Sequence, residues 1–170
     1  MDTLEAILKR RSIRKYTDQK VEKEKLIKLM EAAMAAPTAC NNQPWEFIII
    51  TDDKKMDAVR AGMDYGKYNA PAAIVICNNP EIGLKPFCQD FWEQDCTAAL
   101  ENILLAAVSM DLGTVWLGVH PKEHVIKNVR EFAGIPDHII PLAVVYVGYP
   151  AEEPEPRTQY EERRVHWEQY

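Results

Sequence analysis

The chain has 170 residues, of which 47% are hydrophobic and 27% are charged, and its formal net charge is −6. This composition fits one globular domain and excludes a disordered or fibrous chain. A general nucleic-acid binder needs a basic face against phosphates, so the acidic balance argues against nucleic acid as a partner. No apolar run reaches the roughly 20 residues that span a bilayer, and the acidic start lacks a signal-peptide profile. We therefore expect a cytoplasmic protein without a membrane partner.

A basic segment follows the first predicted helix. Asp2 and Glu5 have capping-box spacing, and the apolar residues after them predict a helix to about Arg11. The basic segment, residues 10–16, has the sequence Arg10-Arg11-Ser12-Ile13-Arg14-Lys15-Tyr16. Arginine forks and a serine hydroxyl suit a phosphate group, but cations also gather at helix C-termini because they complement the dipole. If the segment is extended, Ser12 and Arg14 can face the same ligand.

A loop rich in amide side chains precedes the first predicted strand. Apolar spacing predicts a second helix from about Glu22, which Pro37 stops. The following residues include Asn41 and Gln43, whose mixed donors and acceptors suit the edge of a heterocycle. Turn amides also often bond their own backbone, and both interpretations stay open. A buried strand is predicted over 46–51.

The middle of the chain contains a second predicted strand and a long excursion. A short helix is expected over 52–62 and a strand over 72–77. Residues 78–90 are rich in proline, glycine and asparagine, which suggests a lid. Nearby aromatic side chains either line a substrate mouth or pack under this loop. They are Tyr65, Tyr68, Phe87, Phe91 and Trp92.

The second half of the chain predicts a subunit interface. The helix expected over 96–110 is apolar almost all round, which indicates burial on every side. A second copy of the chain would supply that burial most easily, so a homodimer is predicted. In the strand expected over 114–119, Gly118 either lets backbone approach a flat ligand or simply ends the strand. A helix over 121–132 and a strand over 142–149 follow. The tail, residues 151–170, ends in aromatic residues and should pack on the partner subunit.

The four cysteines and four histidines give no indication of a metal or redox centre. No Cys-x-x-Cys pair is present and the histidines are scattered, so zinc ribbons and thioredoxin-like sites are not expected. Free thiols are the default in a reducing compartment. We expect no metal.

Together these segments resemble the short, single-domain form of the FMN-dependent nitroreductase family. The resemblance rests on the order of the basic segment, the loop over 36–45, the helix over 99–107 leading to the strand over 113–118, and Pro156-Arg157 before the closing residues. It implies an α+β fold with three α/β/α layers and a central mixed, largely antiparallel sheet. It also implies one domain over residues 1–170 and a dimer with exchanged C-terminal tails.

The resemblance further implies which residues hold FMN. Arg10, Ser12 and Arg14 would hold the phosphate and ribityl chain, Arg11 would contribute through its backbone, and Arg157 would add a late phosphate contact. The other implied residues are Pro37, Thr38 and Ala39 covering the flavin from the second subunit, Asn41 and Gln43 at the polar ring edge, and Leu117 and Gly118 presenting N–H groups near the ring nitrogen. No catalytic side chain is implied, because the flavin carries the chemistry.

The predicted function is that of an FMN-dependent NAD(P)H oxidoreductase. It would reduce nitroaromatics, quinones or similar electron-poor acceptors by ping-pong hydride transfer, with NADH or NADPH as the donor. One alternative is a flavoenzyme of the same fold with another reaction, such as dehalogenation, enone reduction or flavin fragmentation. Another is a non-catalytic flavin-binding protein. The sequence leaves open the preferred nicotinamide and the physiological acceptor.

Overall fold

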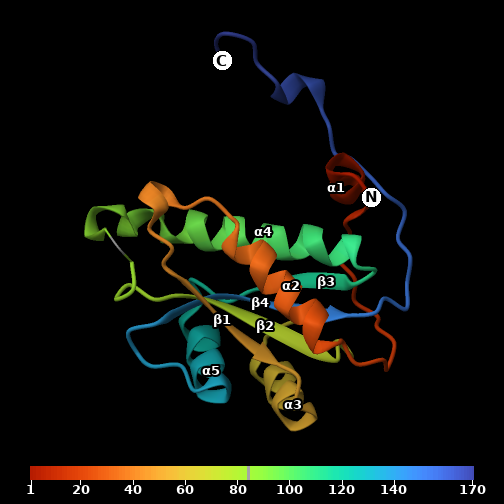
Figure 1. Cartoon of the computed structure of the whole chain (residues 1–170), viewed down its shortest axis with the longest axis vertical. Helices are drawn as coiled ribbons and strands as arrows, with labels where there is room; N and C mark the ends of the chain where they lie inside the picture. Colours follow the sequence, from red (N-terminus) through yellow and green to blue (C-terminus); the bar gives the residue numbers. More distant parts are fainter. Residues whose placement is uncertain (84) are drawn as a thin grey trace.

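The computed structural model describes residues 1–83 and 85–170. Its helices are α1 (Thr3–Lys9), α2 (Lys23–Met34), α3 (Asp53–Gly62), α4 (Trp92–Ser109) and α5 (Glu123–Ala133). Its strands are β1 (Trp45–Ile50), β2 (Ala72–Asn78), β3 (Gly113–Gly118) and β4 (Ile140–Gly148), and three short 3-10 turns are η1 (Ala39–Asn41), η2 (Pro86–Phe91) and η3 (Glu162–Arg164). Figure 1 shows the sheet between a layer of α2 and α4 and a layer of α3 and α5.

The sheet has the strand order β1-β2-β4-β3, and each neighbouring pair is antiparallel. A parallel bridge between Ser12 and Thr114 adds the mixed character. The expected α+β fold with three layers and a mixed, largely antiparallel sheet is therefore confirmed. Every residue of β2 is buried, because a central strand covered on both faces needs apolar residues at nearly all positions.

Two apolar cores form on opposite faces of the sheet. On one face, Met56 and Val59 of α3 and Val129 of α5 pack together with side chains from the sheet. On the other face, Leu29 of α2 and Ile103 of α4 pack in a second cluster. Alternate residues of a strand point to opposite faces, so each strand contributes to both cores.

The helices and strands lie close to where hydrophobic periodicity predicts them. At the start of α1, the Asp2 carboxylate accepts a hydrogen bond from the backbone N–H of Glu5 at 2.8 Å, as the capping-box spacing indicates. Helix α4 begins at Trp92 rather than 96, because η2 leads directly into it and its first turn is largely polar. The expected lid over 78–90 includes residue 84, which lies outside the described residues.

The basic segment lies along the free edge of β3. The N–H of Ile13 donates to the carbonyl of Thr114 at 2.8 Å. This close approach requires a glycine at 113, because a Cβ there would lie 2.8 Å from the Ile13 side chain. Tyr16 is 3% exposed, and its hydroxyl donates to the carbonyl of Ile13 at 2.6 Å. The two apolar residues thus anchor the segment and leave its cations on the outside.

The tail first runs beside the basic segment and then leaves the three layers (Figure 1). The N–H of Ala151 donates to the carbonyl of Lys15 at 2.9 Å, and that of Arg157 donates to Leu8 at 3.3 Å. Farther on, the Trp167 side chain is 82% exposed. In residues 1–83 and 85–170, no helix combines the length and apolarity needed to cross a bilayer.

Candidate functional site

A cavity of about 220 Å³ lies at the free edge of β3. Its walls come from the basic segment, the C-terminal half of β3, the start of α5 and the wall loop, which we define as residues 63–71 between α3 and β2. The lining residues are Arg14, Met63, Asp64, Tyr65, Tyr68, Val115, Trp116, Leu117, Gly118, Lys122 and Val125. The cavity therefore combines an apolar floor with charged groups at its rim.

The edge of β3 presents backbone donors to this cavity. In an antiparallel pair, the residues that bond the neighbouring strand alternate with residues whose backbone groups point away from it. The backbone carbonyl of Thr114 accepts a hydrogen bond from the N–H of Ile13, so the backbone N–H and C=O of Thr114 point away from β4. By the same alternation the N–H groups of Trp116 and Gly118 face the open edge, whereas the N–H of Leu117 faces its β4 partner Val144. The family resemblance implies that the N–H groups of Leu117 and Gly118 lie near the flavin ring nitrogen. Of these two groups, only the N–H of Gly118 points to the open edge of β3.

Two glycines shape this part of the wall. A Cβ at Gly118 would meet no atom within 4 Å, so the space beside it is open to a ligand. Gly66 has a φ of +82°, and a Cβ there would lie 2.8 Å from the Leu117 side chain. The side chain of Leu117 thus extends from β3 toward the wall loop, and this side chain is what Leu117 contributes to the cavity.

The rim of the cavity carries opposite charges. The Lys122 ammonium lies 3.8 Å from a carboxylate oxygen of Asp64 and 4.9 Å from the centroid of the Tyr65 ring. His124 also contacts Asp64, at 2.8 Å. Arg14 lines the same cavity, and among the described residues its side chain donates only a long bond of 3.3 Å to the Ser12 carbonyl. The arginine is therefore available to an anionic or carbonyl-bearing ligand.

The other cations of the basic segment point elsewhere. The Arg10 guanidinium lies 4.0 Å from the Glu101 carboxylate on α4. Burial raises the pKa of Glu101, and the Arg10 charge acts in the opposite direction. Arg11 donates to the backbone carbonyl of Glu155 in the tail. The backbone N–H of Arg157 donates to the carbonyl of Leu8, which places the late arginine beside the end of α1.

The amide loop, residues 37–43, lies away from this cavity in the same chain. None of its residues lines the cavity, and Figure 1 shows η1 near the start of α4, at the far end from α1. The side-chain amide of Gln43 donates to Asn41 at 2.7 Å, and the backbone N–H of Gln43 donates to the Thr38 hydroxyl at 3.1 Å. The sequence left open whether these amides bond the backbone of their own turn or a ligand, and in the single chain the Gln43 amide bonds the Asn41 side chain within the loop.

The amide loop is strained and rests on a buried carboxylate. Cys40, Asn41 and Gln43 have φ values of 52°, 56° and 51°, a conformation that costs energy for residues other than glycine. Asp95 of α4 accepts a hydrogen bond from the N–H of Ala39 at 2.7 Å. Asp95 is 4% exposed and its second oxygen has no partner among the described residues. Burial raises the pKa of Asp95.

Part of the cavity can be predicted from the sequence. Two of the five aromatic residues singled out there, Tyr65 and Tyr68, line it, whereas Phe87, Phe91 and Trp92 do not. Several lining residues were not anticipated, namely Met63, Asp64, Val115, Trp116, Lys122 and Val125. Alternation along the strand around Gly118 could have indicated Trp116, but the contacts of the wall loop depend on tertiary structure.

Comparison with known proteins identifies the family. The model of the nitroreductase family matches residues 7–65 and 60–149, and the chain belongs to that family. A protein of Archaeoglobus fulgidus, provisionally named NADH dehydrogenase/NAD(P)H nitroreductase, is 42% identical over 99% of this chain and 99% of its own length.

Solved structures agree with this assignment. A Parabacteroides distasonis protein with the same provisional name has a TM-score of 0.92 and 43% identity, covering 99% of this chain and 98% of its own. A provisionally named nitroreductase of Desulfovibrio desulfuricans, solved in complex with FMN, has a TM-score of 0.82 and 30% identity, covering 100% of this chain and 98% of its own.

Proposed function

We propose that the chain is an FMN-dependent NAD(P)H oxidoreductase. Family membership supports this, as do a relative named for NAD(P)H and a structural neighbour that binds FMN. The observation that carries the proposal is the free edge of β3, where the outward N–H of Gly118 borders a cavity lined by Arg14 and aromatic side chains. A flat heterocycle needs these features: apolar surface against its faces and polar groups at its edge.

The residues present fit the flavin. The side chains of Leu117 and Tyr68 offer apolar surface, and the open space at Gly118 lets a ring approach the backbone. Arg14 would pair with polar or anionic groups of the cofactor. When bound, FMN would supply the electron-transfer chemistry between NAD(P)H and an acceptor. The chain's own residues would bind and orient it and need not act as nucleophile or base.

The phosphate would lie where the basic segment and the tail meet. Arg10, Ser12 and Arg157 are proposed as its ligands, with Arg11 contributing through its backbone. The backbone bond between Arg157 and Leu8 supports this, because it holds a late arginine beside the end of α1. Charged donors to phosphate form strong, short hydrogen bonds.

A second subunit would complete the site. The cavity of about 220 Å³ is smaller than the roughly 300–1,000 Å³ typical of ligand clefts. Leu4 of α1 is 73% exposed and Trp167 of the tail is 82% exposed, so each leaves apolar surface for a partner. We propose a homodimer of single-domain subunits with exchanged tails. In it the partner's amide loop, with Pro37, Thr38, Ala39, Asn41 and Gln43, would cover the flavin.

The proposed acceptors are nitroaromatics, quinones or similar electron-poor compounds. Aromatic side chains at the rim, such as Tyr65, support a flat acceptor. One pocket would serve NAD(P)H and acceptor in turn, which gives ping-pong kinetics.

The test is the visible spectrum of the purified protein under anaerobic conditions. A flavin spectrum that bleaches on addition of NADH or NADPH and returns with a quinone or nitroaromatic is expected. Bound flavin that neither nicotinamide bleaches would indicate a flavin-binding protein without this activity. A protein that binds no FMN in a titration would refute the proposal.

A further inference from the structure

The wall loop supplies more of the cavity than any other irregular segment. Met63, Asp64, Tyr65 and Tyr68 all come from it, yet it contains no helix or strand. Such a loop has no internal ladder of backbone hydrogen bonds to fix it. Its position must therefore depend on bonds from other parts of the chain.

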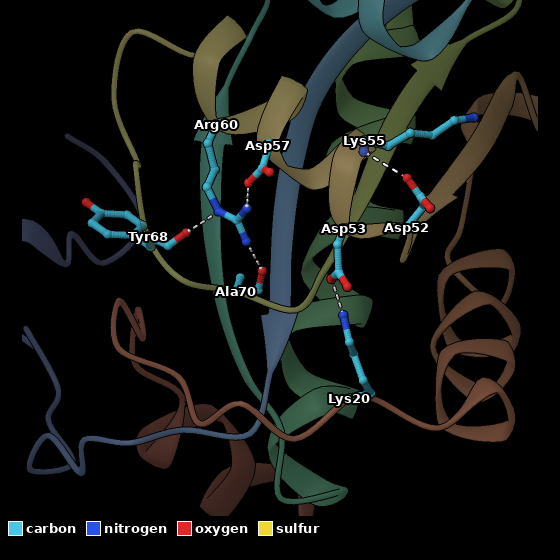
Figure 2. A network of polar contacts seen from close by, with 8 residues as sticks. All are labelled: Lys20, Asp52, Asp53, Lys55, Asp57, Arg60, Tyr68 and Ala70. Carbon is cyan, nitrogen blue, oxygen red and sulfur yellow. Dashed lines mark hydrogen bonds and ion pairs between the residues drawn. The ribbon is translucent and has the colours of Figure 1, made fainter.

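Arg60, in the last turn of α3, supplies two of these bonds. Its Nε donates to the carbonyl of Tyr68 at 2.9 Å, and its Nη2 donates to the carbonyl of Ala70 at 2.8 Å. The remaining Nη1 pairs with Asp57, one turn earlier on α3, at 2.8 Å. Figure 2 shows the guanidinium between the helix and the loop, with all three contacts made at once. The side chain of Arg60 is only 26% exposed.

The same loop is also tied to the basic segment. The Asn69 amide accepts from the N–H of Tyr16 at 3.1 Å and donates to its carbonyl at 2.6 Å. Tyr68 meets the buried Tyr146 edge-on, with ring centroids 6.4 Å apart. A continuous set of contacts thus runs from Arg60 through residues 68–70 to the segment that carries Arg14.

We propose that Arg60 is a positioning residue for the flavin cavity: its planar fork holds the wall loop at the distance from β3 that FMN needs. This inference rests on the proposed function, but it assigns Arg60 no contact with the ligand, because Arg60 does not line the cavity. Lysine cannot replace the fork, because an ammonium is a point donor on a flexible stem and does not hold two carbonyls in a fixed plane.

The chain offers a matched control in Arg130. On α5, Arg130 donates from its Nη2 to the carbonyls of Asp137 and Ile139 at 2.7 and 2.9 Å, so it too ties a connection, the one between α5 and β4, to a helix. Neither Arg130 nor these two partners line the cavity. Arg60→Lys and Arg130→Lys each replace a guanidinium that bonds two loop carbonyls and keep the net charge, and only the first would disturb the wall loop.

The experiment compares FMN affinity, the visible spectrum of bound FMN and the melting temperature of the apoprotein. Wild type, Arg60→Lys, Arg130→Lys and Asp57→Asn are titrated with FMN by fluorescence quenching. Arg60→Lys should raise the Kd about tenfold, the equivalent of one hydrogen bond, and shift the visible band at saturation. Arg130→Lys should lower the melting temperature similarly with little change in Kd. Asp57→Asn, which keeps both carbonyl bonds, should bind FMN as wild type does.

Wild-type affinity and spectrum in Arg60→Lys would overturn the proposal, as would an equal rise in Kd for Arg130→Lys. If Arg60→Lys yields no folded protein, Arg60→Gln takes its place, because its amide can still donate to one carbonyl. Failure of the wild type to bind FMN would instead refute the proposed function. Hydrogen exchange at the amides of the wall loop would then decide the role of Arg60: unchanged exchange in the variant would overturn it, and faster exchange would support it.

Discussion

The carboxylate of Glu152 accepts a hydrogen bond from the backbone N–H of Arg14 at 2.5 Å. The same oxygen accepts from the N–H of Lys15 at 3.2 Å, so one tail residue fixes two donors of the basic segment. Glu152→Ala should lower the free energy of unfolding by about 1–2 kcal/mol, since it leaves both donors without a charged partner. Amide hydrogen exchange at Arg14 and Lys15 should become faster. Glu153→Ala removes the neighbouring charge and should change neither quantity; equal effects of the two variants would contradict the assigned contact.

Arg14 is expected to contribute directly to FMN affinity. It lines the cavity, and its guanidinium makes no ion pair among the described residues. Arg14→Ala should weaken FMN binding by about 1.5–3 kcal/mol, the range for hydrogen bonds to charged groups. Lys15→Ala removes the adjacent cation, which does not line the cavity, and should have a much smaller effect. FMN should also bind better than riboflavin to the wild type, and equal affinity for the two would show that the basic segment and Arg157 do not bind the phosphate.

Alanine substitution at the two glycines of β3 should affect different properties: fold stability at position 113 and FMN affinity at position 118. A Cβ at position 113 would lie 2.8 Å from Ile13, so Gly113→Ala should destabilise the fold by about 1–3 kcal/mol through overpacking. A Cβ at position 118 would meet nothing within 4 Å, so Gly118→Ala should leave the melting temperature of the apoprotein nearly unchanged. It should nevertheless weaken FMN binding, because the methyl group occupies the space proposed for the ring. Unaltered FMN affinity in Gly118→Ala would show that the ring lies elsewhere.

Asp95 should make stability depend on pH. Burial raises its pKa, so the protonated form is favoured in the folded state and ionisation costs stability as the pH rises through the folded pKa. The amide that Asp95→Asn introduces does not titrate, and its oxygen can still accept from the N–H of Ala39. The free energy of unfolding of the variant minus that of the wild type should therefore increase between about pH 4 and pH 7. Urea unfolding of both proteins across this range measures it, and a difference that falls with pH would be inconsistent with a buried, poorly paired carboxylate.

The fold could be predicted well because apolar spacing marks nearly every element. The run Ala72–Asn78 is apolar enough that only a central strand accommodates it, and the structure buries all of it. The start of α4 was missed because Glu93 and Gln94 are polar and exposed, so periodicity begins only after them. Apolar periodicity thus predicts a helix or strand where it has a buried face, and it misses the residues of that element beyond the buried face.

The candidate site could be predicted only where chemistry is local in the sequence. The basic segment and Gly118 stand out because their residue types are unusual for their surroundings. Arg60 does not, since an arginine on a surface helix is ordinary and its two carbonyl partners are fixed only when the wall loop folds back on α3. The cavity itself joins residue 14 to residues 63–68 and 115–125, and no spacing rule connects those ranges.

The final prediction concerns kinetics and follows from one cavity serving two substrates. Apart from the cavity at the β3 edge, a larger space of about 580 Å³ is lined by the tail, Lys9 and Arg11, and it lacks the aromatic surface that a nicotinamide or a flat acceptor would stack on. Donor and acceptor should therefore occupy the same position in turn. Double-reciprocal plots should give parallel lines as the acceptor concentration is varied, and excess acceptor should compete with NAD(P)H for the oxidised enzyme.

Single-turnover measurements give the sharper form of this test. Protein reduced beforehand and freed of nicotinamide should pass its electrons to a quinone without further NAD(P)H. Cys40→Ser should retain this turnover, because the flavin carries the redox chemistry and the thiol is not required for it. Intersecting lines, or a reduced enzyme that reacts only while nicotinamide stays bound, would mean that the two substrates occupy separate sites.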